Sequence, residues 1–239
     1  MEPKLAFISK QIHWSLLIRA AIFAVSWWYF PAWLFVIIAG LLYFIPPFES
    51  RKNIGMFAVF LGVAIATPSG VATAIIYGIL WYYLLMIKNL LIIDRKSGRT
   101  IFAMALSFFL FREFFGIWDR GVTAGALGWA WIVAIAFGIL LNSVIVARRG
   151  KELHAAAAAE RRAVVGVASL LILEAVIAGL FLPVDFIYQS IIVFLVAALL
   201  LDMVPAYFFG ELKSYRIRTT AMTISALLVI VLASARWGI

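Results

Sequence analysis

The sequence predicts an all-α fold, a polytopic membrane bundle of about nine transmembrane helices, one of which could be re-entrant. Hydrophobic residues make up 66% of the chain and charged residues 13%, and the mean hydropathy is +1.10. Soluble domains have about 45–50% apolar and about 25% charged residues. Apolar runs long enough to cross a bilayer alternate with short polar connections. Because the longest polar stretch, 147–162, is too short for a soluble domain, we expect residues 1–239 to form one integral membrane domain.

The apolar runs place the helices in chain order. The first run ends at Pro31 among the aromatic residues of 27–33, a composition typical of a membrane interface. A single helix over 54–93 would be roughly 60 Å long, twice the hydrocarbon thickness, so the TPSG sequence at 67–70 is predicted to divide it. The first of the two resulting helices is short enough to be re-entrant. The expected helices cover residues 14–30, 34–45, 54–66, 71–93, 101–118, 121–146, 163–182, 184–208 and 219–237.

The basic residues predict the orientation of these helices. Lysine and arginine gather in every second connection, whereas the opposite side carries only Arg120 and, at the tail, Arg236. Connections rich in lysine and arginine remain in the cytoplasm. We therefore expect the N-terminus inside and the C-terminus outside, in a membrane that the composition suggests is the prokaryotic cytoplasmic membrane.

Charged residues inside the apolar runs are the candidate functional residues. Arg112 and Glu113 interrupt the central run, and Glu174 interrupts a later one. A charge at the centre of a membrane helix costs about 2.5 to 3.5 kcal/mol or more, so such groups usually find partners or carry function. Arg112 and Glu174 each lie eleven residues beyond the start of their run, roughly 16 Å deep. We expect them to pair, with Glu113 facing a second partner or a water-filled cavity.

A second polar layer is expected closer to the cytoplasmic edge. Arg19 and Asp202 each lie about 8 Å from that edge, and Lys88 and Asn142 fall at a similar level. Asp202 is therefore predicted to pair with Arg19 or Lys88, although both basic side chains could instead extend to the interface. These charges could be structural ion pairs that set helix register, or they could line a path for an ion, a proton or a polar substrate.

The sequence argues against most catalytic and cofactor sites. The chain has no cysteine, and its two histidines, His13 and His154, lie in polar flanks, so no haem, zinc or other metal site and no cofactor is expected. The clustered aspartates that hold magnesium and a diphosphate are missing, and so are glycine-rich nucleotide-binding motifs. The net charge of +9 is explained by membrane topology, so nucleic acid is not expected as a partner.

These observations favour a small permease or transporter in which Arg112, Glu113 and Glu174 line a polar site at the middle of the membrane. The alternative is a non-catalytic integral membrane subunit of a larger complex, and an intramembrane enzyme ranks below both. The expected partners are membrane lipids and either further copies of the chain or other membrane subunits. The two main alternatives differ in one observable: a transporter should turn its polar residues toward an internal cavity, whereas a subunit should display some on its outer surface.

Overall fold

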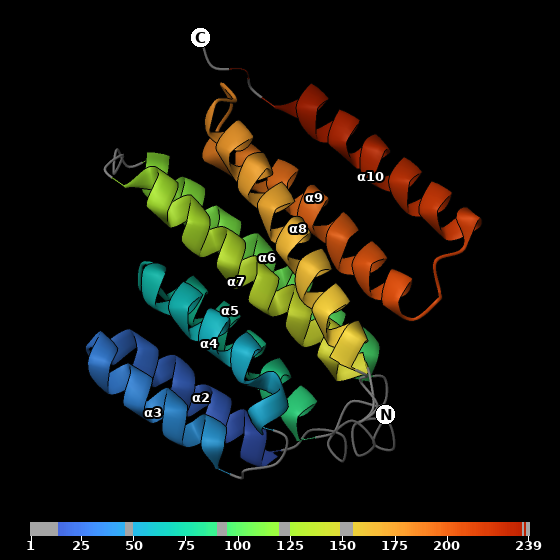
Figure 1. Ribbon diagram of the computed structural model, residues 1–239. Helices are drawn as coiled ribbons and strands as arrows, with labels where there is room; N and C mark the ends of the chain where they lie inside the picture. The colour runs from blue at the N-terminus through green and yellow to red at the C-terminus, as the bar shows by residue number, and fades with distance from the viewer. Residues whose placement is uncertain are drawn as a thin grey trace, which may run out of the picture.

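The computed structural model describes residues 14–45, 50–89, 95–119, 125–148 and 155–235 together with Trp237, and these ranges are helical (Figure 1). An isolated bridge between Val184 and Trp237 is the one β-type contact found in them. The division of the 54–93 run at residues 67–70 is confirmed, since one helix ends at Ala66 and the next begins at Val71. The helices are α2 (Trp14–Tyr29), α3 (Ala32–Phe44), α4 (Ser50–Ala66), α5 (Val71–Lys88), α6 (Arg95–Asp119), α7 (Ala126–Arg148), α8 (Ala155–Leu180), α9 (Phe186–Phe208) and α10 (Ser214–Ser234).

Six helices in the described ranges, α5 to α10, are long and apolar enough to cross a membrane. The predicted helical membrane bundle is therefore supported. The N-terminal helices are shorter: α2 has 16 residues, α3 has 13 and α4 has 17. About 20 residues are needed to cross the hydrocarbon, and α3 extends over only about 20 Å. The count of nine full crossings thus stays a prediction.

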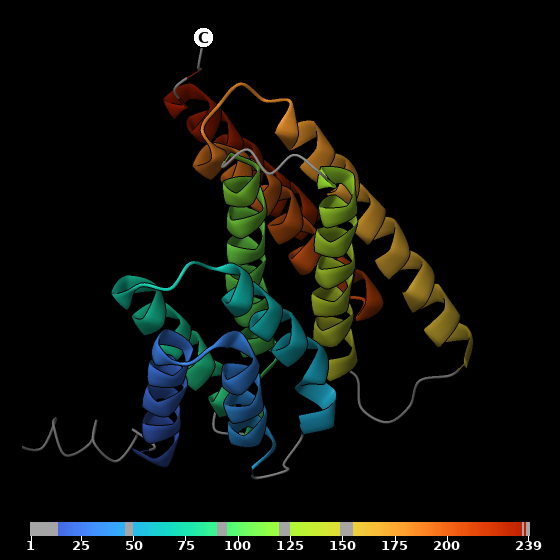
Figure 2. The ribbon, with the colours of Figure 1, turned by 90° about the vertical axis from the view of Figure 1, so that its left-hand side faces the viewer.

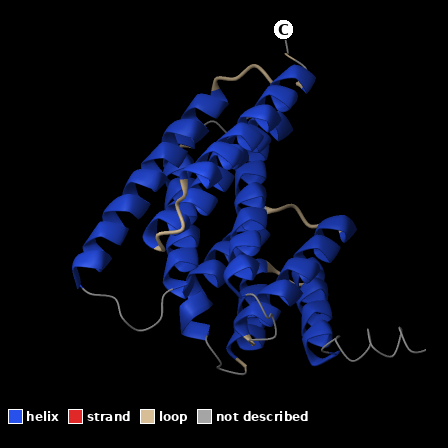
Figure 3. Cartoon of the chain, turned by 90° about the vertical axis from the view of Figure 1, so that its right-hand side faces the viewer, coloured by secondary structure: helices blue, strands red, loops and turns tan. Residues whose placement is uncertain are grey.

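Two groups of helices make up the described structure. The long helices α6 to α9 form a four-membered bundle in which α6 and α8 each pack against both α7 and α9. The shorter helices α2 to α5 lie together beside one end of this bundle, and α6 and α7 extend past them (Figures 1 and 2). The view from the opposite side shows the same difference in height (Figure 3). Helix α10 lies at the edge against α9, and none of its residues is buried.

Aromatic side chains fill the space between α2, α3, α4 and α5. Trp81 is fully buried and stacks on Phe23, with the ring centroids 4.3 Å apart, and Tyr43 stacks on Phe57 at 4.1 Å. Phe60 contacts both Phe23 and Trp81. Since lipid tails are as apolar as these side chains, close packing stabilises the group in a membrane more than the hydrophobic effect does. The aromatic residues thereby hold the four short helices together as one unit.

Small residues allow close approach of helices, both between α4 and α7 and between α2 and α5. A Cβ atom at Gly55 of α4 would lie 2.8 Å from Ile139 Cγ2 and 2.9 Å from Ser143 Oγ on α7. At Gly78 of α5, a Cβ atom would come within 3.2 Å of Ala24 Cβ on α2. Both glycines therefore have a packing role, in keeping with the use of glycine at membrane helix contacts.

Candidate functional site

Arg112 and Glu113 form an ion pair on α6. Arg112 Nη1 donates to Glu113 Oε1 at 2.7 Å, and the two side chains are 37% and 8% exposed, respectively. A carboxylate so deeply buried is strongly disfavoured without a cation nearby, so the guanidinium stabilises its charged form. The predicted pairing of Arg112 with Glu174 is wrong, because the arginine bends toward its own neighbour in the sequence.

Two hydroxyl groups lie near this ion pair and bond to each other, one from Thr67 in the turn between α4 and α5 and one from Tyr77 of α5. Thr67 Oγ1 donates to the carbonyl oxygen of Val63 at 2.9 Å and lies 2.6 Å from the Tyr77 hydroxyl. Because the threonine proton is used by Val63, the tyrosine is the donor in the second bond. Tyr77 is also close enough to interact electrostatically with Arg112 and Glu113. We call Thr67, Tyr77, Arg112 and Glu113 the step cluster.

The step cluster owes its position to the different lengths of the helices. Helix α4 ends at Ala66, beside the cluster, whereas α6 continues for six residues beyond Glu113 to Asp119, which corresponds to about 9 Å. Tyr77, six residues into α5, contacts Phe109, one helical turn before Glu113, so the first two turns of α5 lie near this part of α6. The cluster therefore lies where the short helices end and the long ones continue.

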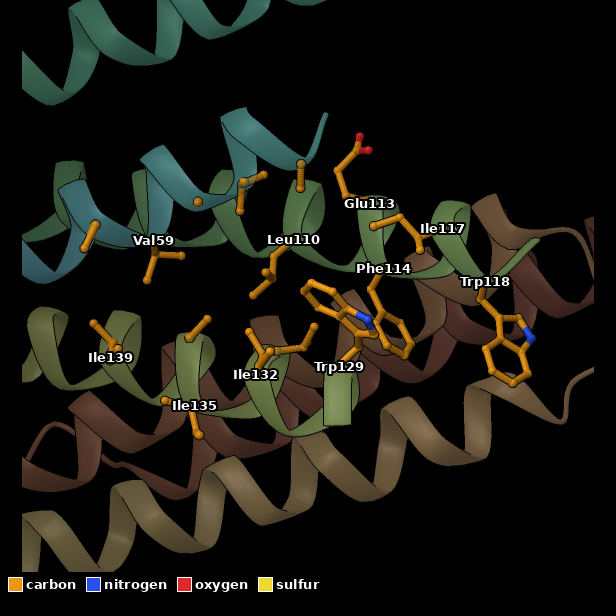
Figure 4. A pocket seen from close by; sticks show the side chains of 16 residues that line it. Val59, Leu110, Glu113, Phe114, Ile117, Trp118, Trp129, Ile132, Ile135 and Ile139 are labelled. Carbon is orange, nitrogen blue, oxygen red and sulfur yellow. The ribbon is translucent and has the colours of Figure 1, made fainter. Parts of the chain in front are cut away.

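An apolar groove of about 410 Å³ lies between α4, α6 and α7 next to the cluster (Figure 4). Glu113 is the one charged residue among those that line it. Figure 4 shows the Glu113 side chain at the α6 edge, with its carboxylate turned away from the apolar interior. The lining residues are Ala58, Val59, Gly62, Val63, Ala66, Leu110, Glu113, Phe114, Ile117, Trp118, Trp129, Ile132, Val133, Ile135, Ala136 and Ile139.

The third predicted site residue, Glu174, lies apart from the other two. It is exposed on α8 and makes no hydrogen bond or ion pair within the part of the chain that the structure describes. Helices α6 and α8 occupy opposite corners of the bundle, since each packs against α7 and α9. The structure thus brings Arg112 and Glu113 together and leaves Glu174 on the outer surface.

Asp202 of the predicted second layer ties α9 to α10. Arg216 Nη2 donates to Asp202 Oδ1 at 2.5 Å, and Thr220 Oγ1 donates to Asp202 Oδ2 at 3.2 Å. The expected pairing of Asp202 with Arg19 or Lys88 is therefore wrong. The basic partner comes instead from the start of α10, a region that the sequence indicates only as a cytoplasmic connection.

The two cations expected near Asp202 lie at the end of α3. Arg19 donates to the carbonyl oxygen of Ile45, and Lys88 donates to that of Tyr43. The Lys88 ammonium also lies 4.7 Å from the centroid of the Tyr43 ring. The last carbonyl groups of a helix lack partners within it and carry partial negative charge, so these cations stabilise the end of α3. Asn142, the fourth residue of this layer, is half-buried on α7 away from these contacts.

The sequence did not indicate that Thr67 and Tyr77 belong to the site. The available signal was a tyrosine within an apolar helix and a threonine at the predicted turn, and both patterns are also common in structural positions. In the ranges that the structure describes, no three histidine, cysteine, aspartate or glutamate side chains are grouped to hold a metal ion. Comparisons with protein-family models, with curated proteins and with solved structures find no match to this chain.

Proposed function

We propose that the protein is a membrane carrier for an amphipathic solute, with an apolar body and one polar or charged head. The observation that carries the proposal is the apolar groove with the Arg112–Glu113 ion pair at its edge. Its volume of about 410 Å³ falls within the range of about 300 to 1,000 Å³ typical of small-molecule sites. The groove would hold the apolar body, and Arg112 and Glu113 would contact the head.

The chemistry of the ion pair supports a head that can exchange with one of its members. A cationic head can take the place of Arg112 at the Glu113 carboxylate, and an anionic head can take the place of Glu113 at the guanidinium. A cationic head keeps the buried Glu113 carboxylate paired and releases Arg112, whose side chain is 37% exposed. An anionic head would instead separate the buried carboxylate from its cation, so the ion pair favours a cationic head.

The short helices support a route to the site. Helix α4 ends and α5 begins near the step cluster. Fewer helices therefore cover α6 beyond the ion pair, toward Asp119, than cover the earlier part of α6. Arg112 retains 37% exposure of its side chain at this position. A solute could therefore approach from the end of the bundle at which α6 terminates, and movement of α4 against α7 would change access to the groove.

We propose the orientation that follows from the basic residues, with the N-terminus in the cytoplasm and the C-terminus outside, in a prokaryotic cytoplasmic membrane. In this orientation the step cluster lies toward the outer surface, because α6 runs from inside to outside. Trp118 and Trp129, at the same end of the groove as Ile117, fit the aromatic layer found at membrane interfaces. Fluorescence quenching of a label at Asp119 by an impermeant reagent added outside the cells would test this orientation.

A second candidate function, a non-catalytic subunit of a larger membrane complex, is favoured by a different observation. Glu174 lies on the outer surface of α8, where a subunit rather than a self-contained transporter would place a charge.

The carrier proposal can be tested in liposomes with fluorescent lipids that share a short acyl chain and differ in the head. The probes are an amine, a phosphocholine and a phosphatidate, and translocation is measured by reduction of the outer-leaflet label with dithionite. We expect the reconstituted protein to accelerate translocation of at least one probe. The absence of acceleration for all three would contradict the proposal.

Gly62→Leu is the variant that tests the groove. Gly62 lines the groove, and a Cβ atom there would meet nothing within 4 Å, so leucine would fill the space without displacing the backbone. Gly40→Leu is the matched control, because Gly40 on α3 has equally free surroundings and does not line the groove. We expect Gly62→Leu to slow translocation by about tenfold or more, as expected for a blocked site, and Gly40→Leu to leave it unchanged. Equal activity of both variants would show that the groove is not the site.

A further inference from the structure

Glu174 is a carboxylate on the outside of a helix that is long and apolar enough to cross a membrane. It lies six residues before the end of the 158–180 span, which corresponds to about 9 Å, and twelve residues after Arg162, which corresponds to about 18 Å. Both distances place the side chain within the hydrocarbon region. An ionised carboxylate in contact with lipid tails is strongly disfavoured, so such residues normally face a partner.

The surroundings of Glu174 have the spacing of a helix contact surface. Ala163, Val167, Leu170, Glu174 and Ala178 are all exposed, and their intervals of four, three, four and four residues place them along one face of α8. We call this set the α8 stripe. Gly166 lies beside it, and a Cβ atom there would meet nothing within 4 Å, so the surface is open at that point. Small residues flanking larger ones favour close approach of a second helix in lipid.

The described residues offer no suitable cation for Glu174. Among the described residues, Arg112 is the cation at a comparable distance from the end of its helix, but it is bonded to Glu113 at 2.7 Å and lies on the opposite corner of the bundle. If the α8 stripe packed against the same stripe of a second copy, two Glu174 carboxylates would face each other. Like charges at that distance repel, so a second copy is a poor occupant.

We propose that the α8 stripe docks a transmembrane helix of a different protein, one that carries arginine or lysine at the level of Glu174. A basic side chain supplies hydrogen-bond donors and a compensating charge to a carboxylate, which itself only accepts. The inference rests on the subunit candidate rather than on the carrier. The carrier is tested with Gly62→Leu and lipid probes, so the two proposals can fail separately.

The test uses synthetic transmembrane peptides and energy transfer. Three fluorescent peptides of leucine and alanine carry a single arginine, leucine or glutamate at the depth of Glu174, and each is mixed in liposomes with the labelled full-length protein. We expect the arginine peptide to bind about tenfold more tightly than the leucine peptide. Glu174→Gln should reduce this preference to within about twofold, whereas Glu160→Gln, fourteen residues before Glu174 near the other end of the same span, should retain it.

A second variant changes the shape of the α8 stripe and keeps the charge of Glu174. Gly166→Leu keeps Glu174 but adds a side chain beside the α8 stripe, and we expect it to weaken binding of the arginine peptide, with Gly40→Leu again as the control. Unfolding temperatures measured for all four variants identify any loss of fold. Equal binding of the arginine and leucine peptides, an arginine preference that persists in Glu174→Gln, or self-association of the protein through Glu174 would each overturn the proposal.

Discussion

The interaction between Arg112 and Glu113 can be measured with a double-mutant cycle. Arg112→Gln removes the guanidinium that donates to the buried Glu113 carboxylate, and Glu113→Gln removes the carboxylate that accepts from Arg112. The double variant removes both charges and retains side chains of similar size. Because the two side chains interact, the double variant should lose less unfolding free energy than the sum of the losses in the two single variants.

The structure sets the expected size of the coupling. Nη1 and Oε1 are 2.7 Å apart, and the centres of charge are then about 4 Å apart, a separation at which two unit charges interact by about 1 kcal/mol in water and about 4 kcal/mol at an effective dielectric of 20. The Glu113 side chain is 8% exposed, whereas that of Arg112 is 37% exposed, so one member is partly screened. We expect a coupling free energy of about 2 kcal/mol, between the two limits.

The assay is reversible unfolding of the purified protein in mixed micelles, followed by circular dichroism as the denaturing detergent is increased. A second cycle, combining Arg112→Gln with Glu174→Gln, is the control, and we expect its coupling to be near zero because Glu174 lies elsewhere. A coupling below about 0.5 kcal/mol for Arg112 and Glu113 would mean that this pair stabilises the protein no more than an ordinary surface ion pair does. A larger coupling for Arg112 and Glu174 would refute the reasoning.

Two further predictions concern packing. Asp202→Asn removes the carboxylate that binds Arg216 and Thr220, so we expect amide hydrogen exchange in Ser214–Ser234 to rise several-fold; unchanged exchange would mean that contacts with α9 hold α10 without this carboxylate. Gly55→Ala places a Cβ atom 2.8 Å from Ile139 and should cost about 1–3 kcal/mol in the same micelle assay. Gly62→Ala, two turns along the same helix with open space around it, should be neutral or slightly stabilising. Equal losses for the two alanine variants would contradict the close contact at Gly55.

Local composition determined the class of the protein and the division of its helices. Hydropathy and the break at residues 67–70 are properties of neighbouring residues, so the bundle and the α4–α5 turn could be predicted without knowledge of packing. The charged residues inside the apolar runs could be identified in the same way, because their positions can be read directly from the sequence. The depth of each charge also followed from the rise per residue, which is why Arg112 and Glu174 were placed at similar levels.

Only the tertiary structure decided which charges meet. A side chain's partner depends on the direction in which it points around the helix axis, and helices that are apolar on all sides carry no pattern that reveals this direction. Arg112 therefore faces Glu113, and Glu174 faces the outer surface, although the sequence predicts a similar depth for both. The groove beside Glu113 likewise depends on where α4 ends relative to α6 and α7, a relation between segments far apart in the sequence that no single segment encodes.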